Sequence, residues 1–170
     1  MQTSVTTHLR LLSVAVLLVA FVLLAPANAD RQPASLYPAS PNRADLNPAA
    51  LAYKLPSQIE WKDTPIGAKM AVMRGDPEKP GPYIVLVKWT PQHMSHPHFH
   101  PNDRFITVIS GTWWVGTGSK FDPESTVAMP AGSFVTHFAK QVHYDGAKDQ
   151  ECVLQIVGEG PATVTPAETK

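Results

Sequence analysis

The sequence predicts an all-β fold, a small barrel or sandwich, on three observations. Short apolar runs recur along the chain, and clusters of glycine and proline that mark turns separate them. The run 83–89 carries apolar residues on both of its alternating faces, which is typical of a strand covered on both sides. No convincing amphipathic helix and no internal repeat is evident. Many short strands with regular turns favour a barrel or a sandwich.

The expected strands can be placed from their apolar residues and from the turns between them. In chain order they are 69–74, 83–89, 105–115, 127–129, 134–138, 143–144 and 151–157. The turns are rich in glycine and proline, and they lie at 75–82, 116–119, 130–132 and 158–161.

Residues 1–29 have the order of a secretory signal peptide. A polar start that contains Arg10 precedes the apolar run 11–25, and Ala27-Asn28-Ala29 supplies the small-x-small pattern of a cleavage site. The apolar run is shorter than the roughly 20 residues that a membrane-spanning helix needs. We therefore expect cleavage before Asp30 and export to the periplasm or the extracellular space.

After cleavage, one small domain with three parts is expected. The parts are an extended arm rich in proline and alanine over 30–57, a barrel over 58–162 and a C-terminal tail over 163–170. Alternating apolar residues at 51–55 can add an edge strand. The arm and the two-sided run 83–89 together favour a homodimer.

The charge balance excludes some classes of partner. Basic and acidic residues number 14 each, and no basic stripe is interleaved with aromatic residues, so no nucleic-acid partner is expected. No membrane partner is expected once the signal peptide is removed. The one cysteine, Cys152, lies in an apolar run and is expected to be a buried small hydrophobe.

A cluster of histidines is the strongest functional signal. Four of the seven histidines fall within eight residues: His93, His96, His98 and His100. In an extended segment His98 and His100 share one face, and two neutral imidazoles at that spacing can hold a transition metal. His143, which follows a later strand, is the candidate third ligand. The alternative interpretation is a solvated histidine-rich loop that binds metal weakly.

Two segments resemble the paired motifs of the cupin superfamily over about residues 65 to 160. The first motif is Gly, five residues, His-x-His, three or four residues, Glu, six residues and Gly, and the spacing of His98, His100, position 104 and Gly111 matches it. The second is Gly, five residues, Pro-x-Gly, two residues and His, and the spacing from Gly132 to His143 matches it. The resemblance implies a small jelly-roll β-barrel around one divalent metal, with Fe, Mn, Zn and Ni not distinguished.

Three positions depart from these motifs. Gln92 replaces the leading glycine, Arg104 replaces the glutamate, and the segment 138–140 replaces Pro-x-Gly. The motif places position 104 on the inner face, and Ile106 and Val108 then follow it inward by alternation. A guanidinium has no free lone pair, so Arg104 is not a ligand.

Two interpretations of Arg104 remain. Either it turns away, and Asp103 or a water molecule takes the fourth metal position, or it anchors a carboxylate-bearing ligand beside the metal. A shifted register with His96, His98 and Asp103 as ligands ranks second to the set His98, His100 and His143.

Two further residues are candidates for lining the pocket. His137 lies on a strand that leads into the second motif, and it faces either the pocket or the opposite surface of the sheet. Gln155 lies among apolar residues, where a buried amide needs a partner, so we expect it to face inward near the pocket.

Two classes of function follow. The first is an exported metal-binding protein whose barrel pocket takes a small organic ligand. The alternative is a mononuclear metal-dependent enzyme, foremost an oxygenase acting on a small organic substrate. No residue is assigned a catalytic role, because neither motif contains a glutamate that would act as general base.

Overall fold

The computed structural model describes residues 46–169 of the chain. The chain divides into two compact units, Met1–Leu51 and Ala52–Lys170. The expected signal peptide and most of the expected arm lie outside the described residues. Of the first unit the structure describes 46–51, a turn in which the Ala50 amide donates to the Asn47 carbonyl at 2.9 Å.

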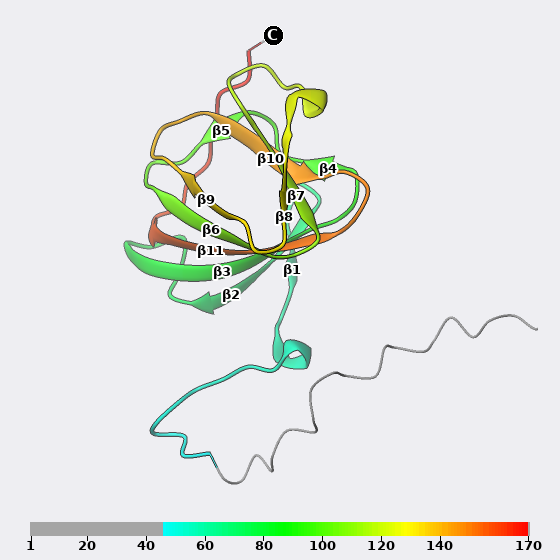
Figure 1. Cartoon of the computed structure of the whole chain (residues 1–170). Coiled ribbons are helices and arrows are strands. Elements are labelled where there is room, and N and C mark those ends of the chain that lie inside the picture. The colour runs from blue at the N-terminus through cyan, green and yellow to red at the C-terminus, as the bar shows by residue number, and fades with distance from the viewer. Residues whose placement is uncertain (1–45, 170) are drawn as a thin grey trace, which may run out of the picture. The chain divides into compact units, whose positions relative to one another are not determined.

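The second unit consists of two antiparallel sheets, which supports the predicted all-β class (Figure 1). One sheet has the order β1 (Lys62–Asp63), β2 (Ala68–Arg74), β3 (Gly81–Trp89), β11 (Cys152–Gly160), β6 (Arg104–Ser110) and β9 (Phe134–His137). The other has the order β12 (Thr165–Pro166), β5 (His98–Phe99), β10 (His143–Ala147), β7 (Thr112–Thr117) and β8 (Val127–Pro130), and β4 (His93–Met94) pairs with β10. Two short 3-10 turns are η2 (Pro56–Gln58) and η3 (Pro123–Ser125). Two such sheets enclosing one interior form the expected jelly-roll barrel.

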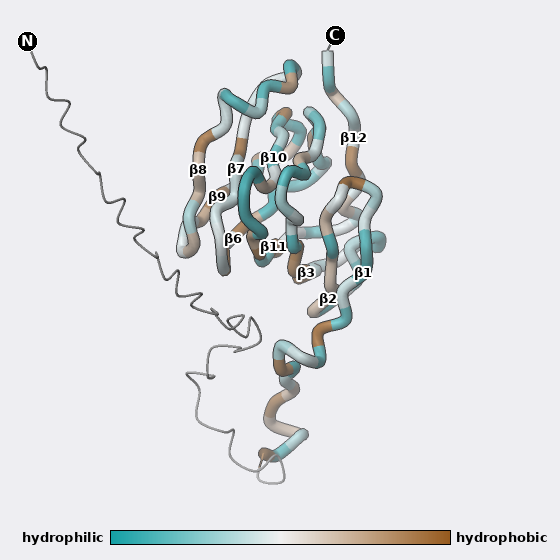
Figure 2. The backbone as a smooth tube through the Cα atoms, turned by 90° about the vertical axis from the view of Figure 1, so that its right-hand side faces the viewer, coloured by the Kyte–Doolittle hydropathy of each residue, from teal (hydrophilic) through white to brown (hydrophobic). Residues whose placement is uncertain are grey.

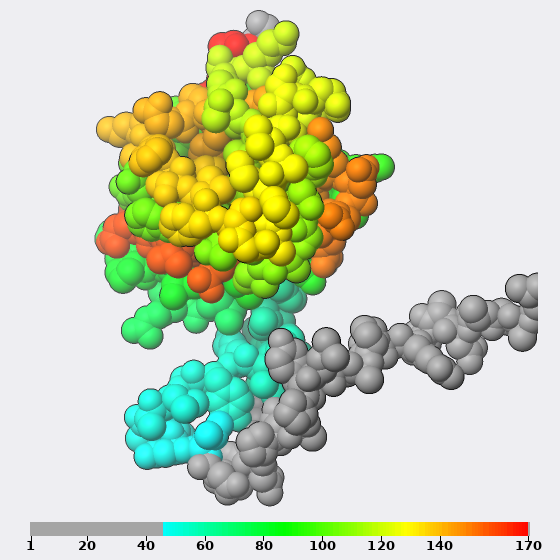
Figure 3. Space-filling model, viewed as in Figure 1, coloured from blue at the N-terminus to red at the C-terminus, as the bar shows by residue number. Residues whose placement is uncertain are grey.

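Alternation along the strands builds the core between the sheets. On β6, Ile106 and Val108 are buried, at 0% and 1% exposed, whereas Phe105 and Ile109 are 45% and 50% exposed. Cys152 is fully buried, as expected, and burial raises the pKa of its thiol to about 12. Teal and brown segments accordingly mix along the strands in Figure 2. In Figure 3, side chains of the yellow segment that includes β8 and β9 cover the barrel end that faces the viewer.

The expected long strand 105–115 is in fact two strands, β6 and β7, which belong to different sheets. The turn is at Gly111, whose φ is +73°, and a Cβ there would collide with the backbone carbonyl of Glu151. Only glycine fits this combination of positive φ and close approach. The motif glycine therefore ends β6, and the chain passes there from the first sheet to the second.

The chain before β2 makes a shorter strand than expected. Residues 51–55 form no strand, and the edge of the sheet is taken by β1, where Lys62 pairs with Met70. Trp61 packs against the outer face of β3, with the Lys88 ammonium 4.7 Å from its ring centroid. Within residues 46–169, no helix has the length and apolar character needed to cross a membrane.

Residues 163–169 differ from the expected tail because they are part of the barrel. Strand β12 pairs with β5, with Thr165 opposite Phe99 and Pro166 opposite His98. Beyond it, the Ala167 amide donates to the Pro97 carbonyl at 2.8 Å. The end of the chain thus adds a strand next to the histidine-bearing segment.

Candidate metal centre

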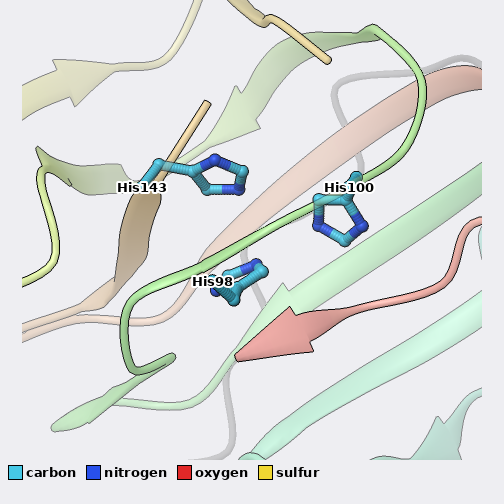
Figure 4. A group of neighbouring side chains, drawn as sticks. All are labelled: His98, His100 and His143. Atoms are coloured by element: carbon cyan, nitrogen blue, oxygen red, sulfur yellow. The ribbon is translucent and has the colours of Figure 1, made fainter. Parts of the chain in front are cut away.

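Strands β5 and β10 bring together the three histidines expected to bind metal. His98 and His143 are opposite each other in the antiparallel register, and His100 follows two residues after His98 on the same face. All three are buried, at 8%, 4% and 4% exposed for His98, His100 and His143. One ring nitrogen from each lies within 4.8 Å of those of the other two. Figure 4 shows the three rings around one shared space.

Backbone carbonyls fix how the three rings are protonated. Nδ1 of His98 lies 2.7 Å from the His96 carbonyl, and Nδ1 of His143 lies 3.0 Å from the Gln141 carbonyl. Nδ1 of His100 lies 2.9 Å from the Thr163 carbonyl. A carbonyl only accepts hydrogen bonds, so each Nδ1 carries the proton and each Nε2 keeps its lone pair. This is the arrangement that orients imidazoles for metal binding.

Two of the three rings, those of His100 and His143, are held in their neutral form. Burial, followed by the positive charge of Arg104, lowers the pKa of His100 from 6.5 to about 2. Burial lowers the pKa of His143 to about 4, and the carboxylate of Asp145 opposes part of that shift. Neutral imidazole is the form that binds a metal, so His100 and His143 are in the metal-binding protonation state at neutral pH.

Arg104 points into the site, as the motif position implies. Its Nη1 donates to Nε2 of His100 at 2.7 Å, the nitrogen that a metal ion would take. Its Nε is buried without a hydrogen-bond partner, and burial lowers the pKa of the guanidinium. Of the two interpretations of this residue, the structure fits the one in which Arg104 stays beside the metal-binding nitrogens.

The shifted ligand set does not come together. His96 is exposed, stacks on Phe121 at a centroid distance of 4.5 Å, and bonds Glu168 at 2.9 Å through Nδ1. Asp103 is exposed, and its carboxylate accepts a hydrogen bond from the Ala139 amide at 2.7 Å. Both side chains therefore act at the surface.

His137 lies against the candidate ligands. The sequence did not decide whether it faces the pocket or the opposite surface of the sheet. It is 5% exposed, it pairs with Arg104 in the register of β6 and β9, and its ring centroid is 3.7 Å from that of His143. Neither ring nitrogen has a hydrogen-bond partner. Burial, together with the charge of neighbouring groups, lowers the pKa of this ring, so His137 is neutral.

Asp145 is a residue of the site that neither sequence motif indicates. This carboxylate is 5% exposed, accepts a hydrogen bond from Trp113 Nε1 at 3.1 Å, and forms a second potential metal-holding group with His137 and His143. It is also the acid whose charge acts on Arg104. The available signal was alternation, since Asp145 lies two residues after His143 in one strand and so shares its inner face.

Gln155 faces away from the site, contrary to expectation. It lies between the buried residues Leu154 and Ile156 on β11 and so points to the opposite face, where its register partners are Leu86 and Thr107. This strand carries apolar residues on both faces, so apolar neighbours do not reveal which face an amide takes.

Comparison with known proteins identifies the fold family. The profile of the ChrR cupin-like domain matches residues 50–163, about two thirds of the chain. The chain belongs to this cupin family. No curated protein matches the sequence.

Solved structures show the same fold at low sequence identity. The polyketide cyclase RemF from Streptomyces resistomycificus is 12% identical with a TM-score of 0.59, and the match covers 71% of this chain and 87% of that one. An RmlC-like cupin from Shewanella frigidimarina is 16% identical with a TM-score of 0.51, covering 65% and 90%. A protein with a double-stranded β-helix domain from Klebsiella pneumoniae is 21% identical with a TM-score of 0.50, covering 64% and 90%. At these identities the likeness concerns the fold alone.

The residues of this cupin domain fit a divalent transition metal. Three neutral imidazoles are a preferred donor set for such ions. Nε2 of His143 is buried without any hydrogen-bond partner, which is costly unless something binds it. The group His98, His100 and His143 can therefore hold one metal ion.

Proposed function

We propose that the protein is an exported cupin that holds one divalent metal through His98, His100 and His143 and binds a small organic ligand beside it. The observation that carries the proposal is the common state of the three rings. Each Nδ1 is bound to a backbone carbonyl, which leaves Nε2 of each ring without a proton, and the three buried rings bring one nitrogen each within 4.8 Å of the others. A chance histidine cluster on a loop would not be held in this way.

The chain divides the work at the site among a few groups. The imidazoles bind the ion, the carbonyls of residues 96, 141 and 163 orient the rings, and burial keeps the rings away from bulk water. A divalent metal bound there supplies a Lewis acid with positions open to a ligand. Arg104 supplies a second, fixed positive charge next to it.

Metal content of the purified protein tests the proposal. After loading and dialysis, elemental analysis should find one equivalent in the parent protein and in His96→Ala, the control that removes an exposed histidine. His100→Ala and His143→Ala should each lose stoichiometric metal, because each removes one of three ligands. A parent protein without metal, or a His143→Ala protein with a full equivalent, would refute the proposed site.

A metal-dependent enzyme, foremost an oxygenase, is the second candidate. The observation that favours it is His137, a buried neutral imidazole with no hydrogen-bond partner beside the ligand His143, since such a group can form a hydrogen bond to a substrate held next to the metal. Iron- or manganese-loaded protein would then consume dioxygen with some member of a panel of catechols, flavonols and diketones. Tight zinc binding with no turnover of any member favours the binding protein.

Export rests on the order of residues 1–29. The polar start, the apolar run and Ala27-Asn28-Ala29 support a cleaved signal peptide. Mass spectrometry of protein from its native host should find Asp30 at the N-terminus. A soluble cytosolic species that retains Met1 would contradict export.

A homodimer is the proposed assembly. Apolar side chains remain exposed on the outer face of the sheet, among them Phe105 at 45% and Phe134 at 65%, whose rings stack with centroids 6.5 Å apart. Light scattering at micromolar concentration should give twice the mass of one chain. A monomer mass would refute the proposal, and Phe134→Ser should shift the dimer toward that mass.

A further inference from the structure

Arg104 has hydrogen-bonding capacity that the protein does not use. Its Nε is buried with no partner, and an unsatisfied buried donor on a charged group is costly. Its Nη1 donates to Nε2 of His100, but a metal ion would take that lone pair. In the metal-bound protein, two donor positions of one guanidinium would then lack an acceptor.

The charges of the site do not balance either. Among the buried residues of the described chain, Asp145 is the one carboxylate, and it already accepts a hydrogen bond from Trp113. A divalent ion and the guanidinium together carry three positive charges against this single negative charge. Such an excess in a water-excluded interior needs an anion to offset it.

A second donor lies next to Arg104. Tyr83 on β3 is 2% exposed, and its hydroxyl lies over Gly158, where a Cβ would be only 2.7 Å from the hydroxyl oxygen. Gly158 is directly opposite Arg104 in the pairing of β11 with β6. Burial raises the pKa of Tyr83, so its phenol keeps the proton that it can donate.

We propose that the site binds a small organic carboxylate, held by the guanidinium of Arg104 and the hydroxyl of Tyr83 next to the metal-binding histidines. The inference rests on the proposed metal site, and it specifies the class of ligand that this site takes. A guanidinium matches the two oxygens of a carboxylate, and the phenol adds a neutral donor. The ligand's charge also offsets part of the excess positive charge.

Calorimetric titration of the metal-loaded protein tests this ligand class. The probes are propionate and its neutral isostere propionamide, at constant ionic strength set with sodium chloride. Propionate should bind at least tenfold more tightly than propionamide. Arg104→Gln should abolish this preference while metal content stays at one equivalent, and Tyr83→Phe should weaken propionate several-fold. Arg74→Gln, which removes an exposed arginine from β2, should bind both probes like the parent protein.

The outcomes separate this inference from the metal site. Equal binding of propionate and propionamide by protein that holds its metal would refute the carboxylate ligand and leave the proposed metal site standing. If the parent protein holds no metal, the proposed metal site is refuted. Equal binding of both probes by this metal-free protein would then refute the carboxylate ligand as well. Should Arg104→Gln fail to fold, Arg104→Lys is the variant to test, because lysine keeps the positive charge but lacks the paired N–H donors of the guanidinium. Unchanged affinity in that variant would refute the role of the guanidinium.

Discussion

The guanidinium of Arg104 and a metal ion compete for one nitrogen of His100. The hydrogen bond between Nη1 and Nε2 is 2.7 Å long, so Arg104 already occupies the lone pair that a metal needs. A metal ion must displace it and then tolerate a positive charge close by. We therefore expect Arg104 to weaken metal binding, even though it does not prevent the three histidines from grouping.

Replacing Arg104 with glutamate should strengthen metal binding. Arg104→Glu removes the competing donor and the like charge, and it adds a carboxylate ligand, so a gain of about tenfold or more is expected, since one charged hydrogen bond contributes roughly 1.5–3 kcal/mol. Competition with a chromophoric chelator measures the affinity. Arg104→Gln, which removes the charge without adding a carboxylate, should gain less. Weaker binding by Arg104→Glu would show that Arg104 does not oppose the metal.

We expect His137 to destabilise the folded, metal-free protein. Neither of its buried ring nitrogens has a partner, and such groups cost about 1–3 kcal/mol. His137→Leu, of similar volume and without polar atoms, should raise the free energy of unfolding in urea by about 1 kcal/mol and keep one equivalent of metal. A loss of metal would instead make His137 a ligand.

Among the structural elements, the turns of the two cupin motifs keep their backbone shape without their glycines. Gln92 and Lys140 stand at motif glycine positions and have φ values of +64° and +62°. The Lys140 amide donates to the carbonyl of His100 at 2.8 Å, so this turn also supports the metal centre. A side chain in this left-handed region is strained by roughly 1–2 kcal/mol.

Restoring one of these glycines should stabilise the barrel. Lys140→Gly relieves the backbone strain and loses part of that gain to the greater freedom of glycine in the unfolded chain, so a net gain of about 0.5–1 kcal/mol is expected. Thermal unfolding measures it. Lys140→Ala, which keeps a Cβ, is the matched control and should gain little. A destabilised Lys140→Gly protein would mean that the lysine side chain contributes more than the strain costs.

Strand β12 should support metal binding through His100. Removing residues 163–170 deletes the Thr163 carbonyl that holds Nδ1 of His100 and the pairing of β12 with β5. Loss of a partner that orients a ligand lowers metal affinity by about 10–100-fold. A chain that ends at Pro166 keeps both contacts and should bind metal more tightly than one that ends at Ala162. Equal affinity of the two truncated chains would contradict the role of β12.

At the scale of the whole molecule, folding keeps several titratable groups neutral between the two sheets. The pKa values of His100, His137 and His143 are all lowered, with burial as the largest cause. Their unfolded counterparts take up protons near pH 6.5. Between pH 6.5 and the lowered pKa values of the folded state, the unfolded chain binds more protons than the folded one. Acid therefore favours unfolding.

Acid should therefore destabilise the metal-free protein in a defined range. The free energy of unfolding should fall as the pH is lowered from about 6.5 toward 4, by up to about 1.4 kcal/mol per pH unit for each histidine kept neutral. Urea titrations at several pH values measure the slope, and His137→Leu should make it shallower. Stability that is flat over this range would mean that the histidines titrate alike in the folded and unfolded states.

Local sequence patterns were sufficient for the fold class and the three metal-binding candidates. Strand alternation placed Ile106 and Val108 inside, because side-chain direction depends on neighbouring residues, and the resemblance to the two cupin motifs paired His98 and His100 with His143.

Tertiary structure alone decided the surroundings of those histidines. Tyr83 lies over Gly158, the register partner of Arg104, Thr163 holds the ring of His100, and Gln155 faces outward. These relations join residues on different strands or choose between two apolar faces. They depend on which strands pair and in which register, and this is set by packing the whole barrel rather than by any one segment.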